Sequence, residues 1–249
     1  MTGNWRASVA VYGDRRVLMV LALGFASGLP LLLTLSTLSA WLTSVGVTRA
    51  TVGYFALVQL SYSCKFLWSP LIDRLDLPVL TRLLGRRRSW GLTIQTLLVA
   101  AVLALGASDP ASQLHLTGIL AALVAFLSAS QDIVIDAYRV EILDRDRQGP
   151  GAAVVQTGYR LAMLVAGAGA LYLASAFGWF VAYAAMAALL AVGMAVFLFG
   201  PEPEVKVSAM TAERERRAGE YLASRPALDG WRARMVAWLY GAAVCPFAD

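Results

Sequence analysis

Residues 114–141 read LHLTGILAALVAFLSASQDIVIDAYRVE, a long apolar run that ends in a polar cluster. A helix that crosses a bilayer needs roughly 20 predominantly apolar residues. This stretch is long enough, yet it places Asp132 and Asp136 four residues apart inside the predicted span. Because a charged side chain is costly in the hydrocarbon region, the two aspartates need partners or water. The stretch therefore predicts a membrane helix with one polar face.

The composition of the whole chain favours a membrane protein. Hydrophobic residues make up 59% of the 249 positions and charged residues 15%, against about 45–50% and about 25% in soluble domains. The net charge of +5 does not indicate nucleic-acid binding, since membrane proteins concentrate Lys and Arg in cytoplasmic loops. The two cysteines and the single histidine belong to no motif, so we predict no metal site and no cofactor.

Six apolar segments are long enough to cross a bilayer. They cover residues 17–42, 51–72, 89–107, 114–140, 152–175 and 178–200. We therefore expect an all-α membrane protein with a cytoplasmic N-terminus (1–16), a six-helix transmembrane domain (17–200) and a cytoplasmic linker (201–249). The linker carries a short apolar stretch near its end, which we interpret as interfacial. A seventh span cut off by the end of the chain is the alternative.

The loop charges predict the orientation. Of the 21 Lys and Arg residues, two lie deep inside predicted spans, Arg139 lies where the fourth span meets its loop, and Arg49 alone lies in the first, third and fifth loops. All the others lie in the N-terminal segment, the second and fourth loops and the tail. Lys and Arg accumulate in cytoplasmic loops, so both ends of the six-helix unit are expected in the cytoplasm.

Four ionisable residues lie well inside predicted spans: Lys65, Asp132, Asp136 and Arg160. Each costs about 2.5–3.5 kcal/mol at the centre of an isolated helix. At about 100° per residue, the two aspartates share one stripe of the fourth span. We expect the four side chains to face the bundle interior or a water-filled cavity, where Lys65 and Arg160 supply counter-charges to the aspartates.

Two alternatives stay open for this cluster. It is either a polar pathway for substrate or protons, or a purely structural ion network that fixes helix packing. Asp136 lies closer to the cytoplasm than Asp132, so it is also placed to anchor the fourth loop through Arg139 or Arg145.

The first and sixth spans differ in character. The first carries Gly24, Ser27, Gly28 and Pro30 near its middle, which predicts either a kinked helix that lines a cavity or a close approach of two helices. The sixth is almost entirely apolar, and we expect it to face lipid.

Several motifs resemble one transporter family. The segments GFASGLPLLLTLSTLSAWL, VGYFALVQLSYSCKFLWSPLIDR, SASQDIVIDAYRVE and QTGYRLAML resemble AmpG-type muropeptide permeases, members of the major facilitator superfamily. The loop LIDRLDLPVLTRLLGRRRSW resembles the superfamily's signature between its second and third helices, here lengthened by an insertion. The resemblance covers residues 15 to 200 and is more specific for the family than for the substrate, because acetyl-coenzyme A transporters belong to the same broader family.

This resemblance implies import of 1,6-anhydromuropeptides across the bacterial inner membrane by proton symport, during cell-wall recycling. Asp132 and Asp136 are then the proton-coupling candidates. The substrate-binding candidates are Lys65, Arg160, Gln131, Tyr159 and Gln95, and the gating loop comprises Asp73, Arg74, Gly85, Arg86, Arg87 and Arg88. The family has twelve spans in two halves with the site between them, so a second six-helix half is an expected partner, beside lipid, protons and a glycopeptide substrate.

Two other classes of function compete with transport. A membrane enzyme needs a nucleophile, a metal cluster or a paired acid and base, and no such motif is present in the sequence. A membrane scaffold does not need charges of both signs at mid-depth. The sequence therefore favours a transporter.

Overall fold

The computed structural model describes residues 11–203 and residues 216 and 220, except for the side chain of Arg74. The chain divides into two compact units, residues 1–203 and 204–249, and the first of these is described below. The predicted linker and its apolar stretch lie almost entirely outside the described residues.

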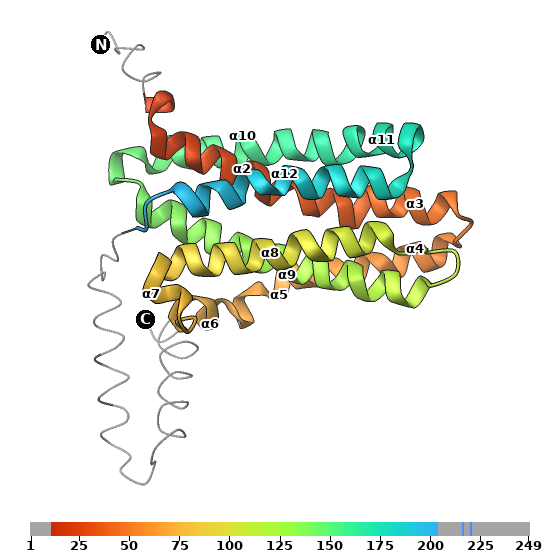
Figure 1. Cartoon of the computed structure of the whole chain (residues 1–249), viewed down its shortest axis with the longest axis horizontal. Helices are drawn as coiled ribbons and strands as arrows, with labels where there is room; N and C mark the ends of the chain where they lie inside the picture. Colours follow the sequence, from red (N-terminus) through yellow and green to blue (C-terminus); the bar gives the residue numbers. More distant parts are fainter. Residues whose placement is uncertain (1–10, 204–215, 217–219, 221–249) are drawn as a thin grey trace. The chain divides into compact units, whose positions relative to one another are not determined.

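Every regular element in residues 11–203 is helical (Figure 1). The α-helices are α2 (Arg15–Leu32), α3 (Leu38–Ser44), α4 (Arg49–Phe55), α5 (Leu60–Cys64), α6 (Ser69–Arg74), α7 (Leu80–Leu84), α8 (Arg86–Ala107), α9 (Leu114–Ile142), α10 (Gln148–Leu164), α11 (Ala170–Phe177) and α12 (Trp179–Phe199). The 3-10 turns are η1 (Val11–Gly13), η3 (Ala56–Gln59), η4 (Lys65–Leu67) and η5 (Arg145–Arg147). Two π-helical turns, η2 (Leu33–Thr37) and η6 (Val165–Gly169), join α2 to α3 and α10 to α11.

Five helical stretches in the described residues are long and apolar enough to cross a membrane. They are Arg15–Ser44, Arg86–Ala107, Leu114–Ile142, Arg145–Phe177 and Trp179–Phe199, and they correspond to the first, third, fourth, fifth and sixth predicted spans. The prediction of an all-helical membrane protein is therefore confirmed.

The second predicted span, residues 51–72, is not one continuous helix, so the count of six regular spans is not confirmed. From Arg49 to Arg74 the short helices α4, α5 and α6 alternate with the 3-10 turns η3 and η4. Pro70 lies in the first turn of α6, where it has no amide hydrogen with which to continue the preceding helix. In Figure 1, α4 lies near α3 and α6 lies near α7 at the opposite end, so the segment still runs the length of the unit.

Helices α2 and α10 pack with their backbones in contact. A Cβ atom on Gly24 would lie 2.4 Å from the carbonyl oxygen of Val155, and one on Gly28 would lie 2.5 Å from that of Tyr159. A Cβ on Gly158 would meet the backbone of α2 at 2.3 Å. Small residues four apart allow two membrane helices this close approach. Of the two alternatives for the first span, the structure therefore shows close helix approach.

The two π-helical turns lie against each other and receive hydrogen bonds from side chains. Such turns interrupt the regular ladder of backbone hydrogen bonds. Thr37 Oγ1 in η2 donates to the carbonyl of Ala166 in η6 at 2.7 Å. The Tyr183 hydroxyl of α12 donates to the carbonyl of Leu33 at 2.9 Å. Both donors are buried, so the interruptions are satisfied within the protein.

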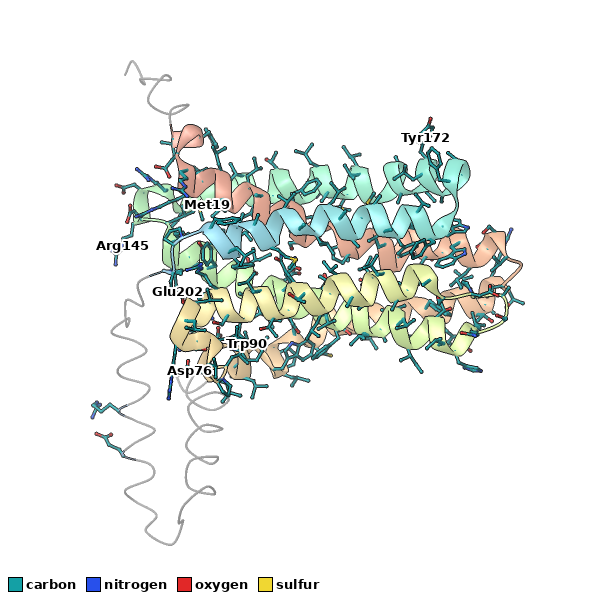
Figure 2. The ribbon with its side chains drawn as sticks, in the orientation of Figure 1. Met19, Asp76, Trp90, Arg145, Tyr172 and Glu202 are labelled. Atoms are coloured by element: carbon teal, nitrogen blue, oxygen red, sulfur yellow. The ribbon has the colours of Figure 1, made fainter. Side chains whose placement is uncertain are left out.

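The two ends of the bundle are built from different side chains. At the end that carries α3, Trp41 stacks on Trp179 with ring centroids 5.5 Å apart, and Tyr183 lies against Trp41 at 5.4 Å. We call this the aromatic end. The opposite end, where Figure 2 shows Met19, Arg145 and Glu202, is called the charged end. The charged end is the one predicted to face the cytoplasm.

Candidate functional site

Asp132 lies on α9 and takes its hydrogen bond from the first span. Ser27 of α2 donates to Asp132 Oδ1 at 2.5 Å. The neighbouring Gly28 brings Tyr159 of α10 against α2, so two adjacent residues of α2 position the carboxylate and a tyrosine. Within the described residues Asp132 forms no ion pair, and its carboxylate is held by a neutral hydroxyl.

Hydroxyl groups from three helices surround this carboxylate. Tyr62 of α5 and Tyr159 of α10 both lie close enough to Asp132 to interact with it electrostatically. Tyr62 and Ser128 have buried hydroxyls that lie near each other without forming a well-aligned hydrogen bond. A layer of neutral polar groups with unused hydrogen-bonding capacity therefore surrounds one ionisable group.

Lys65 pairs with Asp136 and not with Asp132. Its Nζ lies 3.9 Å from Asp136 Oδ2, and the two side chains are 38% and 59% exposed. Lys65 therefore supplies a counter-charge to Asp136, and it lies close enough to Asp132 to interact with it electrostatically without forming an ion pair. The lysine stem is long and flexible, so its ammonium reaches toward the charged end rather than across the helix at its own depth. The alternative of an Asp136 anchor through Arg139 or Arg145 is not seen either.

The remaining substrate-binding candidates occupy two kinds of position. Arg160 is exposed on α10, one residue after Tyr159, and it forms no ion pair in the described part of the chain. Gln95 of α8 and Gln131 of α9 are fully buried, and the amide groups of both lack hydrogen-bond partners. Gln95 packs against Gly193 of α12, where a Cβ atom would lie 2.2 Å from its Nε2.

A cavity of about 470 Å³ lies between the 65–73 segment and α9. Lys65 and Asp136 line one part of it, and Asp73 and Glu141 line another. The cavity therefore runs from the mid-span ion pair to the charged end of the bundle.

Arg87 closes the charged end by joining three helices. Its guanidinium donates to Asp73 of α6 at 2.7 Å and to Glu141 of α9 at 2.6 Å through Nη2 and 3.0 Å through Nε. The Arg87 side chain is 7% exposed. A buried arginine held by two carboxylates is a fixed bridge, because losing either partner strands a charge.

Glu202, which follows α12 in the sequence, completes this cluster. Its carboxylate accepts the backbone amides of Arg87 and Arg88 at 2.8 and 3.1 Å, which caps the first turn of α8. Gly85 has a φ of +87° and lies against this carboxylate. Arg88 in turn donates to the carbonyls of Phe197 and Leu198, and Figure 2 shows Glu202 at this end of α8.

The gating-loop candidates therefore divide into three groups. Asp73, Gly85, Arg87 and Arg88 are part of the cluster. Arg86 begins α8, and its buried Nε has no hydrogen-bond partner. The side chain of Arg74 lies outside the described residues.

Sequence comparison assigns the family. The family model described as Major Facilitator Superfamily matches residues 40–248. The chain belongs to the major facilitator superfamily. It is 47% identical over 194 residues to the protein named anhydromuropeptide permease in Escherichia coli K12, which is 78% of this chain and 39% of that protein. The predicted resemblance to AmpG-type permeases is thereby confirmed.

Two further relatives match over similar lengths. The chain is 36% identical over 197 residues to a putative transporter AmpG 4 of Rickettsia felis, which covers 78% of this chain and 47% of the relative. It is 38% identical over 192 residues to an uncharacterized protein of Haemophilus influenzae, with 77% and 44% coverage. The chain thus spans less than half the length of each of these relatives, and the matches lie in their N-terminal regions.

Sequence reasoning missed four residues of this major-facilitator site: Ser27, Tyr62, Glu141 and Glu202. Glu141 ends the polar stretch of residues 128–141, and its position after Asp136 on α9 is a usable signal. Ser27 was noted only as a small residue in the first span. Glu202 stands in the segment interpreted as a linker, and no local pattern pairs it with α8. In the described residues no group of three His, Cys, Asp or Glu side chains is arranged to hold a metal ion.

Proposed function

We propose that this major-facilitator chain supplies the first half of a proton-coupled importer of 1,6-anhydromuropeptides. The relatives that it matches are named permeases and transporters, and the proposal extends their activity to this chain together with a second six-helix half. The chain would lie in the bacterial inner membrane with its N-terminus and charged end in the cytoplasm, as the loop charges predict.

The observation that carries proton coupling is the environment of Asp132. This carboxylate lies inside a membrane-spanning helix, accepts a hydrogen bond from Ser27 and has no ion-pair partner in the described residues. A carboxyl group in such a place can exist in a neutral and a charged form, because burial disfavours its charge and no cation in the described residues lies within ion-pair distance of it. Intramembrane carboxylates of this kind serve as proton relays in transporters. Asp136 is the second proton-coupling candidate, and protonation would free Lys65 from it.

Substrate recognition is assigned to the cations and hydroxyls near this carboxylate. A muropeptide carries peptide carboxylates and sugar hydroxyls, so Lys65 and Arg160 are suited to the former and Tyr159 to the latter. The Lys65–Asp136 separation of 3.9 Å between partly exposed groups leaves the ammonium available to a competing carboxylate. Gln95 and Gln131 would reach substrate only after a movement that uncovers their buried amides.

The Arg87 cluster is proposed as the gate of this half. Because it joins α6, α8 and α9 at the charged end of the 470 Å³ cavity, its rupture would let the 65–73 segment move away from α9. Alternating access in this superfamily requires such an opening on one side of the membrane at a time.

The proposal is tested by uptake of anhydromuropeptide into proteoliposomes under an imposed proton gradient. The chain is co-reconstituted with a second half from the same family. Asp132→Asn should abolish the accumulation of anhydromuropeptide that the proton gradient drives. It should leave counterflow exchange of the substrate intact, because the asparagine side chain still accepts the Ser27 hydrogen bond. Asp109→Asn, a change in the exposed turn between α8 and α9, is the matched control.

Unchanged gradient-driven uptake by well-expressed Asp132→Asn protein would sink the proton assignment. If acetyl-coenzyme A competes for uptake and muropeptide does not, the substrate assignment changes to that of the acetyl-coenzyme A transporters in the same broader family. Full uptake by the chain alone, as a monomer, would overturn the half-transporter assignment. Cysteine labelling that places residues 86 and 111 on the same side of the membrane would refute the orientation.

A further inference from the structure

A groove on the outer surface of the unit runs between the start of α2 and the end of α12. One cavity of about 440 Å³ lies at the charged end and includes Arg15, Arg16 and Pro201 in its lining. A second cavity of about 210 Å³ adjoins it and includes Ala195 and Val196. Arg15, Met19, Phe199 and Gly200 line both cavities, so the two form one groove.

The groove changes from charged to apolar along its length. Its outer part carries Arg15 and Arg16, while its inner part is lined by Met19, Val196 and the 77% exposed ring of Phe199. Gly200 leaves the space into which the Met19 side chain packs, since a Cβ atom there would lie 2.4 Å from Met19 Cε. A ligand that fits this groove needs a polar head and an apolar tail.

The charges around the outer part leave one cation uncompensated. Asp14 is paired with Arg147, and their atoms lie 2.6 Å apart. Arg16 has Asp144 as its ionic partner at 3.8 Å. Arg15 is exposed and makes no ion pair or side-chain hydrogen bond within residues 11–203. It also stands in the first turn of α2, where the helix dipole favours an anion.

Three carbonyl acceptors near the groove are already in use. The carbonyls of Phe197 and Leu198 accept from Arg88. The carbonyl of Pro201 accepts from the Tyr138 hydroxyl at 2.8 Å. The groove therefore offers its ligand the Arg15 guanidinium, which is unpaired among the described residues, and this suits a phosphate better than an ammonium group.

We propose that this groove binds an anionic phospholipid of the inner leaflet. The lipid phosphate lies at Arg15, and an acyl chain lies along Met19, Val196 and Phe199. Membrane proteins attract anionic lipids through basic residues next to their spans, each worth about five-fold in affinity. The site lies on the side of the unit made by α2 and α12, apart from the cavity beside Lys65, and it does not depend on the transported solute.

The test is lipid retention by the full chain in detergent, measured by native mass spectrometry with phosphatidylglycerol and phosphatidylcholine at equal concentration. The wild-type chain should retain phosphatidylglycerol in preference. Arg15→Gln should lower that preference about five-fold. Arg82→Gln, which removes an exposed arginine of α7 at the same end, should leave the preference unchanged.

A second variant tests the acyl part of the groove. Val196→Trp fills the inner cavity and should reduce the retention of both lipids, while the monodisperse elution of each variant verifies its fold. Equal retention of the two lipids by the wild-type chain would overturn the proposal, as would an Arg82→Gln effect as large as that of Arg15→Gln. Displacement of the lipid by soluble glycerophosphoglycerol at the same concentration would show a free-anion site instead.

Discussion

Two helix interfaces of this unit are held together in opposite ways. We call the interface of α2 with α10 the closed seam and that of the 49–74 segment with α9 the open seam. Between α2 and α10 the backbones touch at Gly24, Gly28 and Gly158. Between the 49–74 segment and α9 lie a cavity of about 470 Å³ beside residues 65–73, one 3.9 Å ion pair and the ring of Trp68, which packs on Phe126 and donates to Ser130, with Arg87 bridging the charged end. The first seam has no room to open without losing its contacts, whereas the second contains a cavity and, apart from the Trp68–Phe126 contact, polar links that water or a ligand can replace. Movement in this half is therefore expected at the second seam.

The largest effect is expected from breaking the bridge across the open seam. Arg87→Ala leaves Glu141 and Asp73 without their cation, and removal of one partner from a buried pair costs about 3–5 kcal/mol. Because Asp73 is 44% exposed, we expect the free energy of unfolding to fall by an amount near the lower end of that range. The melting temperature should fall with it. Arg82→Ala, at an exposed arginine of α7, should change stability little. Equal melting temperatures for the two variants would show that Arg87 does not hold the seam.

A smaller effect is expected from forcing the closed seam apart. Gly28→Ala places a methyl group 2.5 Å from the Tyr159 carbonyl oxygen, and overpacking of this kind costs about 1–3 kcal/mol. The matched control is Gly53→Ala in α4, where nothing lies within 4 Å of the added carbon. This control should be neutral or stabilising by up to about 1 kcal/mol, because alanine favours the helix. Thermal unfolding in detergent measures the stability of both variants. If both gain or both lose stability, the contrast between the seams is not supported.

The smallest effect is expected from the ion pair in the middle of the open seam. A double-mutant cycle on Lys65→Ala and Asp136→Asn should give a coupling of about 0.2–1 kcal/mol, as for other partly exposed pairs. The same cycle with Asp132→Asn should give a smaller coupling, since Ser27 and not Lys65 holds that carboxylate. A coupling of Lys65 that is larger to Asp132 than to Asp136 would show that Lys65 acts mainly on Asp132.

The sequence was sufficient for the regular helices and insufficient for the irregular one. Residues 114–140 are predicted as a span and form α9, Leu114–Ile142. The prediction succeeds because apolar length and turn residues are local properties of the sequence. The 51–72 segment satisfied the same criteria. It folds instead as short helices and 3-10 turns, and Pro70 lies in the first turn of the last of these helices, α6, where it cannot donate the amide hydrogen bond of a continuous helix. Length and hydropathy do not record that loss of regularity.

Pairing was the least predictable feature of the candidate site. The stripe that contains Asp132 and Asp136 follows from helical periodicity and is present on α9. Partner assignment used depth alone, but depth does not say which face of a neighbouring helix turns toward the site. Ser27 and Glu202 became partners through tertiary packing, and no local pattern marks them. A hydroxyl in a Gly-rich span and a glutamate after the last span are the signals worth testing in relatives.

The cap on α8 has a consequence for the order in which the protein is made. The amides of Arg87 and Arg88 enter the membrane interface early in synthesis, but the carboxylate that caps them belongs to Glu202, more than 110 residues later. Until α12 has been inserted, the first turn of α8 therefore lacks its capping carboxylate. The contacts of Glu202 with Arg87 and Arg88 can therefore form only after residue 202 has been synthesised.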